Sequence, residues 1–235
     1  IGGTGRMKPY VIIVAGGKGL RMGSDLPKQF IPVAGKPLLM HTVEKFGDWN
    51  PDAEIILVLP ADHQPYWKML CKEIGCRAKH RIVTGGETRF HSVRNGLEVI
   101  RAEIGEGAEN VWVAVHDGVR PFVSTEVITA CFDQAKIKGA VVPALPVVDS
   151  LREVGSEGKS KPVDRSRYYA VHTPQVFRAD LLLRAYTQDY SPLFTDDASV
   201  VEAMNIPVDI VPSNRENIKI TTPLDLVIAK ALLGE

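Results

Sequence analysis

The sequence of 235 residues is poor in cysteine, has no excess of either charge and contains no long hydrophobic run. Its three cysteines, Cys71, Cys76 and Cys131, include no CxxC pair, which argues against a disulfide framework or a zinc site and favours inert thiols in a reducing compartment. Basic and acidic residues number 28 each, so no overall charge attracts the chain to nucleic acid or an anionic membrane. No apolar run approaches the roughly 18 residues of a membrane span and no signal peptide is visible, so we expect a soluble, cytoplasmic protein.

Several catalytic and cofactor signatures are also missing. The six histidines form no HExxH motif, and neither GxSxG nor another serine-hydrolase pattern is present. The pair Gly17-Lys18 is followed by Gly19 rather than Ser or Thr, which excludes a Walker A loop. Met22 stands where a dinucleotide fingerprint needs its third glycine, and the next apolar run ends in Pro60 without an acid. Binding of NAD is therefore excluded as well.

What is present is a regular alternation of short apolar runs and helical patterns. The runs predict strands at 10–15, 54–60, 81–84, 111–116 and 140–146. Helical spacing fills the gaps, with predicted helices around 39–46 and at 62–74, 90–104 and 124–138. The alternation predicts an α/β fold with a Rossmann-like, mostly parallel sheet and helices on both faces. We expect residues 7–235 to form a single domain and residues 1–6 to be a cloning remnant.

Residues 147–171 interrupt this alternation. Two runs with strand character flank the polar stretch GSEGKS, which predicts an antiparallel hairpin that projects from the domain as a β-arm. Because an isolated hairpin is only marginally stable, we expect the arm to pack against a second copy of the chain.

The glycine-rich stretch VAGGKGLRMGSDLPKQF at 14–30 predicts a polyphosphate site. Its glycines allow backbone N–H groups to approach a ligand closely; they are Gly16, Gly17 and Gly19. Three cations add positive charge at the same bend: Lys18, Arg21 and Lys28. Ligands of such sheets bind beyond the carboxyl ends of the strands, where this loop would lie.

Other polar motifs fall at the same edge of the predicted sheet. Gly85-Gly86-Glu87 follows the run at 81–84, and the motif HDGVRPF places Asp117 directly after the run at 111–116. An acid in this position can hold a metal ion or a ligand hydroxyl. Further hydroxyls and cations come from VDR at 163–165, HTPQ at 172–175, TDDAS at 195–199 and NIKIT at 217–221.

Taken together, these motifs resemble a known enzyme family. AGGKGLRMG followed by PKQF is similar to the sugar-nucleotidyltransferase signature, and the later motifs narrow the resemblance to the 2-C-methyl-D-erythritol 4-phosphate cytidylyltransferase family. The resemblance implies transfer of CMP from CTP to methylerythritol phosphate, with release of pyrophosphate, in the non-mevalonate route to isoprenoids. It also implies Mg²⁺ as cofactor and a homodimer in which the β-arm completes the partner's site.

The resemblance also implies roles for individual residues. Catalysis falls to cations that neutralise phosphate charge: Arg21, Lys28 and Lys219. The nucleotide is held by Ala15, Gly16, Gly17, Gly19, Gly85, Gly86, Glu87, Ser92 and Asp117. The acceptor is held by Asp117, Arg120, Ser150, Arg165, Thr173 and Thr195. Mg²⁺ would be bound mainly by the phosphates of CTP, with Asp117 as a further ligand. The chain departs from the family where Ser150 replaces Thr and Glu87 replaces Asp.

Two other functions stay open at this point. A cytidylyltransferase for another polyol phosphate, such as ribitol 5-phosphate, would share the first loop, and a non-catalytic nucleotide-binding regulator would keep the glycines and lose the cations. His116 and His172 adjoin the motifs, and the sequence leaves both structural roles and proton transfer open for them.

Overall fold

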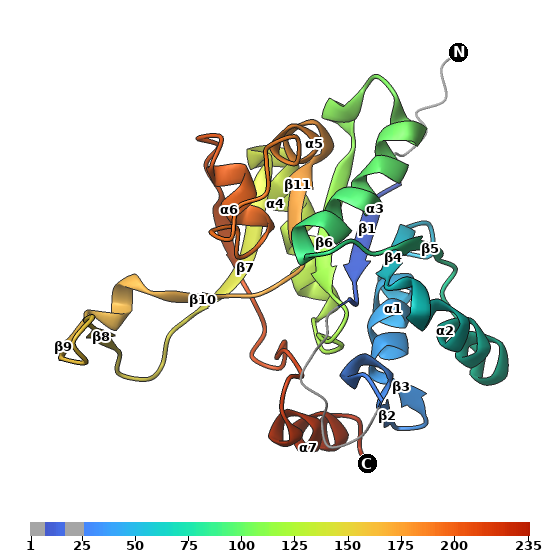
Figure 1. Cartoon of the computed structure of the whole chain (residues 1–235), viewed down its shortest axis with the longest axis horizontal. Coiled ribbons are helices and arrows are strands. Elements are labelled where there is room, and N and C mark those ends of the chain that lie inside the picture. Colours follow the sequence, from blue (N-terminus) through green and yellow to red (C-terminus); the bar gives the residue numbers. More distant parts are fainter. Residues whose placement is uncertain (1–7, 17–25) are drawn as a thin grey trace.

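The computed structural model describes residues 8–16 and 26–235, so the predictions for Gly17, Lys18, Gly19 and Arg21 lie outside the described residues. An eight-stranded sheet runs through the molecule in the order β10-β7-β11-β6-β1-β4-β5, with β12 beside β7 (Figure 1). Its strands are β1 Tyr10–Val14, β4 Glu54–Leu59, β5 Arg81–Thr84, β6 Trp112–Asp117, β7 Ala140–Pro146, β10 Tyr169–Val171, β11 Gln175–Arg178 and β12 Asp209–Pro212. The five predicted strands are all confirmed.

Helices follow most strands, as the helical patterns predict. The α-helices are α1 Leu38–Trp49, α2 Gln64–Leu70, α3 Arg89–Ile104, α4 Thr125–Lys138, α5 Ala179–Ala185, α6 Asp197–Glu202 and α7 Pro223–Leu232. Short helical turns are η1 Lys28–Phe30, η2 Ala61–His63, η3 Cys71–Gly75, η4 Ala108–Asn110 and η5 Arg165–Arg167. Across residues 8–16 and 26–235, no helix combines the length and the apolar character needed to cross a membrane.

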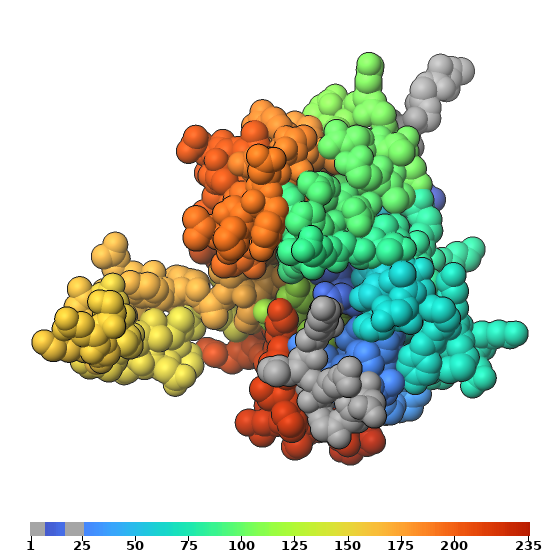
Figure 2. Space-filling model, in the orientation of Figure 1, coloured from blue at the N-terminus to red at the C-terminus, as the bar shows by residue number. Residues whose placement is uncertain are grey.

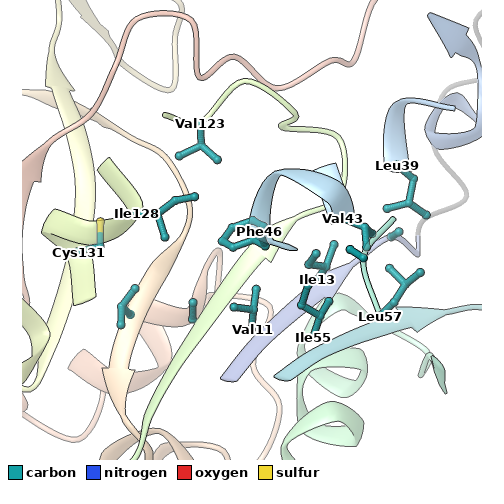
Figure 3. Close-up of a cluster of buried hydrophobic side chains, with 14 of the residues drawn as sticks. Val11, Ile13, Leu39, Val43, Phe46, Ile55, Leu57, Val123, Ile128 and Cys131 are labelled. Carbon is teal, nitrogen blue, oxygen red and sulfur yellow. The ribbon is translucent and has the colours of Figure 1, made fainter. Parts of the chain in front are cut away.

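Alternating side chains of the sheet contribute to two cores, one on each face. On β1, Val11 and Ile13 point to the face covered by α1 and α4, where Phe46 and Ile128 pack (Figure 3). Ile12, on the opposite side of the same strand, packs in the core under α3, α5 and α6. Burial on both faces explains why these strands read as continuous apolar runs, and it confirms the predicted α/β fold with helices on both faces.

Two strands of the sheet, β11 and β12, escaped prediction; β12 pairs in parallel with β7. β1 pairs in parallel with β4 and β6, but β11 lies between β6 and β7 and is antiparallel to both. The segment reaches this position because β10, just before it in the chain, runs back along the end of β7. Neither strand stands out as an apolar run, because β11 reads QVFR and β12 reads DIVP.

The β-arm is present as a hairpin that extends well away from the body of the molecule (Figures 1 and 2). Strands β8 Arg152–Val154 and β9 Ser160–Pro162 pair in an antiparallel manner at its tip. Its base is formed by the pairing of β10 with the end of β7. The predicted hairpin is therefore confirmed, with its last strand joined to the main sheet.

Candidate active site

The centre of the site is Asp117, the last residue of β6. Its carboxylate is surrounded by three basic side chains: Arg89 Nη2 lies 3.3 Å from Oδ1, Arg120 Nε lies 3.1 Å from Oδ2, and Lys219 Nζ lies 3.8 Å from Oδ2. Burial alone would raise the pKa of Asp117, but these neighbouring charges hold it well below its ordinary value. Asp117 therefore stays ionised and draws cations from three separate segments to one point.

Two cavities adjoin at this carboxylate. Both are lined by Arg89, Asp117 and Lys219. The first cavity also contacts Ala15, Gly16, Lys28, Gln29 and Ser92. The second also contacts Arg120, His172, Thr173, Gln175, Thr195 and Asp196. The structure thus brings part of the predicted site together at the carboxyl edge of the sheet. The predicted residues that line these cavities are Ala15, Gly16, Lys28, Ser92, Asp117, Arg120, Thr173, Thr195 and Lys219.

Lys28 reaches the first cavity because the residues after it are anchored. The buried Gln29 side chain donates from Nε2 to the carbonyl oxygen of Ala15 at 3.3 Å, which ties η1 to the end of β1. Partial burial lowers the pKa of Lys28, the nearby Lys219 lowers it further, and Asp117 opposes both effects. The Lys28 ammonium group therefore lies in a positively charged site, where an anionic ligand would relieve the repulsion.

The turn between β5 and α3 is joined to the first cavity through Ser92, which lines it. Gly86 donates its N–H to Ser92 Oγ at 3.0 Å, and Ser92 is buried on the first turns of α3. A Cβ atom on Gly86 would lie only 2.5 Å from His91 Cβ, so a larger residue there would displace the turn. Glu87 is exposed beside this turn.

A buried hydrogen-bond network holds the backbone of Asp117 in place. The Asp117 backbone N–H donates to Thr173 Oγ1 at 3.0 Å, and this hydroxyl also lies 2.9 Å from His116 Nδ1. His116 Nε2 lies 2.9 Å from the carbonyl oxygen of Arg120. Because Nε2–H must donate to that oxygen, Nδ1 accepts from Thr173 and the ring is neutral. Burial lowers the pKa of His116 to about 4, which agrees with the neutral ring.

The C-terminal motif is joined to the same network. Arg120 Nη1 donates to the carbonyl oxygen of Asn217 at 2.8 Å, and Asn217 Nδ2 donates to the carbonyl oxygen of Thr173 at 2.9 Å. Lys219 follows two residues later. The segments containing HDGVRPF, HTPQ and NIKIT are therefore held together by side-chain contacts to backbone oxygens, which fixes Lys219 near Asp117.

Comparisons with known proteins agree with this arrangement. A sequence model of the family described as IspD, 2-C-methyl-D-erythritol 4-phosphate cytidylyltransferase, matches residues 10–235. The chain belongs to this family. It is therefore a nucleotidyltransferase.

Similar proteins span nearly the whole chain. The cytidylyltransferase of this name from Bacteroides fragilis is 57% identical over 222 residues, covering 94% of this chain and 98% of the relative. That from Bacteroides thetaiotaomicron is 56% identical over 227 residues, covering 97% and 100%. Among solved structures, the 4-diphosphocytidyl-2C-methyl-D-erythritol synthase from Anaerococcus prevotii is similar with a TM-score of 0.80 at 28% identity, covering 97% of each chain. The structure of the Francisella tularensis cytidylyltransferase is similar with a TM-score of 0.77 at 33% identity, covering 95% of this chain and 99% of that chain.

The cavities contain two residues that sequence reasoning missed, Arg89 and Gln29. Arg89 bridges Asp117 and Asp197, with 3.1 Å between Nη2 and Asp197 Oδ2, and Asp197 is fully buried beneath it. Gln29 lines the first cavity and anchors η1. Arg89 stands two residues after the predicted Gly85-Gly86-Glu87 turn, and Gln29 stands inside the motif PKQF. Their position beside a glycine turn and a cation was the signal that could have found them.

Two predicted acceptor residues lie elsewhere. Ser150 and Arg165 are exposed on the β-arm, and neither is among the described residues that line the two cavities. Arg165 Nη1 donates instead to the carbonyl oxygen of Val148, within the arm itself. One copy of the chain therefore does not bring these side chains to its own site.

The described residues do not form a cage for a metal ion. No group of three or more His, Cys, Asp or Glu side chains with suitable geometry occurs in the described part of the chain. Both carboxylate oxygens of Asp117 are already paired with cations. A divalent cation would need several more oxygen ligands, so a direct protein site does not fit these residues.

Proposed function

We propose that this chain transfers CMP from CTP to 2-C-methyl-D-erythritol 4-phosphate. An oxygen of the acceptor phosphate attacks the α-phosphorus of CTP, a new P–O bond forms, and the bond to the β-phosphate breaks to release pyrophosphate. The observation that carries the proposal is the pair of adjoining cavities that share Lys219, Arg89 and Asp117. Two phosphate-bearing substrates could meet there, one from each side.

The first cavity suits the nucleotide. Backbone groups of Ala15 and Gly16 and the Gly85-Gly86 turn would contact the base and ribose, with Ser92 and Glu87 beside them. Lys28 would neutralise the triphosphate as negative charge develops on the α-phosphorus in the transition state. Arg21 is proposed to act with Lys28 on the same phosphates, together with the backbone around Gly17 and Gly19.

The second cavity suits the acceptor. Arg120 and Lys219 would bind its phosphate, and the hydroxyls of Thr173 and Thr195 would contact the polyol. Four basic and two acidic side chains stand among the described residues that line the two cavities. The surplus of positive charge favours two anionic substrates together.

The reaction needs no general base from the protein. A phosphate monoester loses its second proton near pH 6, so at neutral pH the attacking oxygen is already largely anionic. Burial lowers the pKa of both His116 and His172 to about 4, the latter with help from Arg120. Both rings are neutral at pH 7, and we assign them to positioning. Catalysis then comes from in-line positioning and charge neutralisation.

Mg²⁺ enters this scheme as part of the substrate Mg·CTP. Triphosphate oxygens supply the hard ligands that Mg²⁺ prefers, whereas Asp117 is occupied by three cations. We therefore assign Asp117 to holding Arg89, Arg120 and Lys219 in place.

We further propose that residues 7–235 act as one nucleotidyltransferase domain in a homodimer. Large apolar side chains are exposed on the arm, which favours a partner surface; they are Val148, Val154, Tyr168, Tyr169 and Val171. In such a dimer, Ser150 and Arg165 would reach the acceptor cavity of the partner subunit.

The test is pyrophosphate release measured with CTP, UTP, ATP and GTP against methylerythritol phosphate and ribitol 5-phosphate. We expect turnover with CTP and methylerythritol phosphate at a kcat/KM well above every other combination. Preference for ribitol 5-phosphate would assign the chain to another polyol phosphate. Nucleotide binding without pyrophosphate release in any combination would identify a non-catalytic regulator.

A further inference from the structure

Two cysteines meet at the end of the α2 segment, outside every motif of the site. Cys76 donates its backbone N–H to the carbonyl oxygen of Cys71 at 3.3 Å, and Gly75 between them has φ +85°. This six-residue closure with a left-handed glycine is the Schellman arrangement. A contact between the side chains of its first and last residues commonly accompanies this arrangement, and here both side chains pack against the same core cluster. The turn CKEIGC therefore brings two thiols together.

The surroundings make Cys76 the more reactive thiol. Its thiol donates to the carbonyl oxygen of Ala78 at 3.7 Å, and the sulfur lies near Cys71 and His80. The interaction with Cys71 lowers the pKa of Cys76, and burial opposes this effect. Trp67 Nε1 donates to His80 Nε2 at 3.0 Å, which leaves the imidazole proton on Nδ1, next to Ala78 O at 2.9 Å.

Solvent reaches this pair but not the third cysteine. Cys71 and Cys76 are both partly exposed, whereas Cys131 is fully buried on α4 (Figure 3). Burial raises the pKa of Cys131 to about 12. Thiolate character and access decide which cysteines react, so oxidation should select the exposed pair. We therefore keep the sequence-based expectation of an inert thiol for Cys131 and infer a different behaviour for Cys71 and Cys76.

The pair is also connected to the nucleotide cavity by packed side chains. Cys71 and Cys76 pack against the core cluster that contains Trp67 and Phe30. The rings of Trp67 and Phe30 stack with centroids 6.4 Å apart, and Phe30 closes the η1 turn that begins at Lys28. A change at Cys76 would pass through His80 and Trp67 to this turn.

We propose that Cys71 and Cys76 form a hydroperoxide-responsive dithiol that closes to a reversible disulfide and thereby slows CMP transfer. The Cys76 thiolate would attack a peroxide oxygen and release hydroxide, giving a sulfenic acid. The Cys71 sulfur would then attack the oxidised sulfur, and its proton would leave with the hydroxyl group as water. Two thiols and one hydrogen peroxide thus give one disulfide and two waters.

The expected loss of rate follows from geometry. A disulfide needs its sulfurs about 2 Å apart, much closer than two thiols in contact. Closure of the disulfide would pull Cys76 away from His80. The hydrogen bond between His80 and Trp67 would then change, and so would the packing of Trp67 against Phe30. A misplacement of about 1 Å can cost up to roughly 10²-fold in rate, and we expect kcat to fall threefold or more. The expected loss of rate rests on the proposed function.

The test treats the full chain with stoichiometric hydrogen peroxide and follows both the disulfide and the rate. We expect peptide mass mapping to find a Cys71–Cys76 disulfide, and dithiothreitol to reverse both the disulfide and the loss of kcat. Cys131→Ala should behave like the unmodified sequence, whereas Cys71→Ser should keep its rate after peroxide. Thermal melting by circular dichroism checks that both variants are folded.

Each negative result of this experiment contradicts a different part of the proposal. Absence of the Cys71–Cys76 disulfide, or an equal loss of rate in Cys71→Ser, overturns the dithiol. A disulfide that forms without changing kcat overturns its connection to Lys28. Failure of the reduced enzyme to turn over CTP refutes the proposed function, while the mass measurement still decides whether the dithiol exists.

Discussion

Among single residues, Lys28 has the most direct relation to the proposed chemistry. It lines the first cavity, and its pKa is lowered by burial and by Lys219. We expect Lys28→Ala to lower kcat by about 10²- to 10³-fold, the usual cost of one preorganised group that stabilises transition-state charge. Steady-state pyrophosphate release measures this, with the exposed Lys79→Ala as control. A normal kcat with only a raised KM would contradict the catalytic role.

The lowered pKa of Lys28 also predicts a pH effect. Lys28 must be protonated to act, so kcat/KM should fall as the pH rises through its pKa in the free enzyme. Because that pKa is lowered, the fall comes at a lower pH than for an ordinary lysine. Arginine stays protonated throughout the range, so Lys28→Arg should move the alkaline limb upward. An unchanged limb in Lys28→Arg would assign the titration to another group.

Asp117 allows the role of the protein in metal binding to be tested. We expect Asp117→Asn to lower kcat/KM by at least about tenfold, because Arg89, Arg120 and Lys219 lose the charge that holds them together. The Mg²⁺ concentration for half-maximal rate should not change, since the metal arrives with CTP. Titrations of Mg²⁺ at saturating CTP make the comparison. A large increase in that concentration would identify Asp117 as a metal ligand.

For single residues, the sequence predicted which residues belong to the site better than it predicted the contacts between them. Asp117, Arg120, Thr173 and Lys219 were predicted and lie together. The pairing of Arg89 with Asp197 was not predictable, because the two residues are 108 positions apart in the chain. The pairing depends on where the fold places α6 relative to α3, and no local pattern encodes that.

Among the structural elements, the turn between β5 and α3 depends most strictly on one glycine. An alanine Cβ at Gly86 would lie 2.5 Å from His91 Cβ, so the turn must shift and lose its bond to Ser92. We expect Gly86→Ala to raise KM for CTP by roughly an order of magnitude and to leave KM for the acceptor nearly unchanged. Gly155→Ala is the control, because its added methyl meets nothing closer than 3.5 Å. Equal effects on both substrates would argue against nucleotide binding by this turn.

The elements themselves were predictable to different degrees. Strands such as β1 and β4 are buried on both faces, so their sequences are apolar throughout and easily recognised. β11 and β12 have four residues each, and their place in the sheet follows from pairing with β7 rather than from their own sequence. The arm was predictable because its two runs flank a polar turn, although its attachment through β10 was not.

For the whole molecule, the main question is how the arm contributes to a site. Arg165 is exposed on the arm and does not line the cavities of its own chain. If the arm crosses to a partner subunit, Arg165 would bind the acceptor phosphate there through charge-assisted hydrogen bonds. Arg165→Ala should then raise KM for methylerythritol phosphate far more than KM for CTP. Arg167→Ala, a neighbouring exposed arginine, is the matched control.

Mixing two impaired variants distinguishes action within a subunit from action across the dimer. Lys28→Ala lacks a working nucleotide loop and Arg165→Ala lacks a working arm, so a hybrid dimer would contain one site with both intact. If equal amounts of the two variants exchange subunits freely, half of the dimers would be hybrids. Each hybrid would have one working site of its two, so the rate should recover to about a quarter of normal. Pull-down of differently tagged subunits confirms that exchange has occurred. Complete exchange without recovery above the sum of the two variants would place Arg165 in the site of its own subunit, because only then does every hybrid contain two impaired sites.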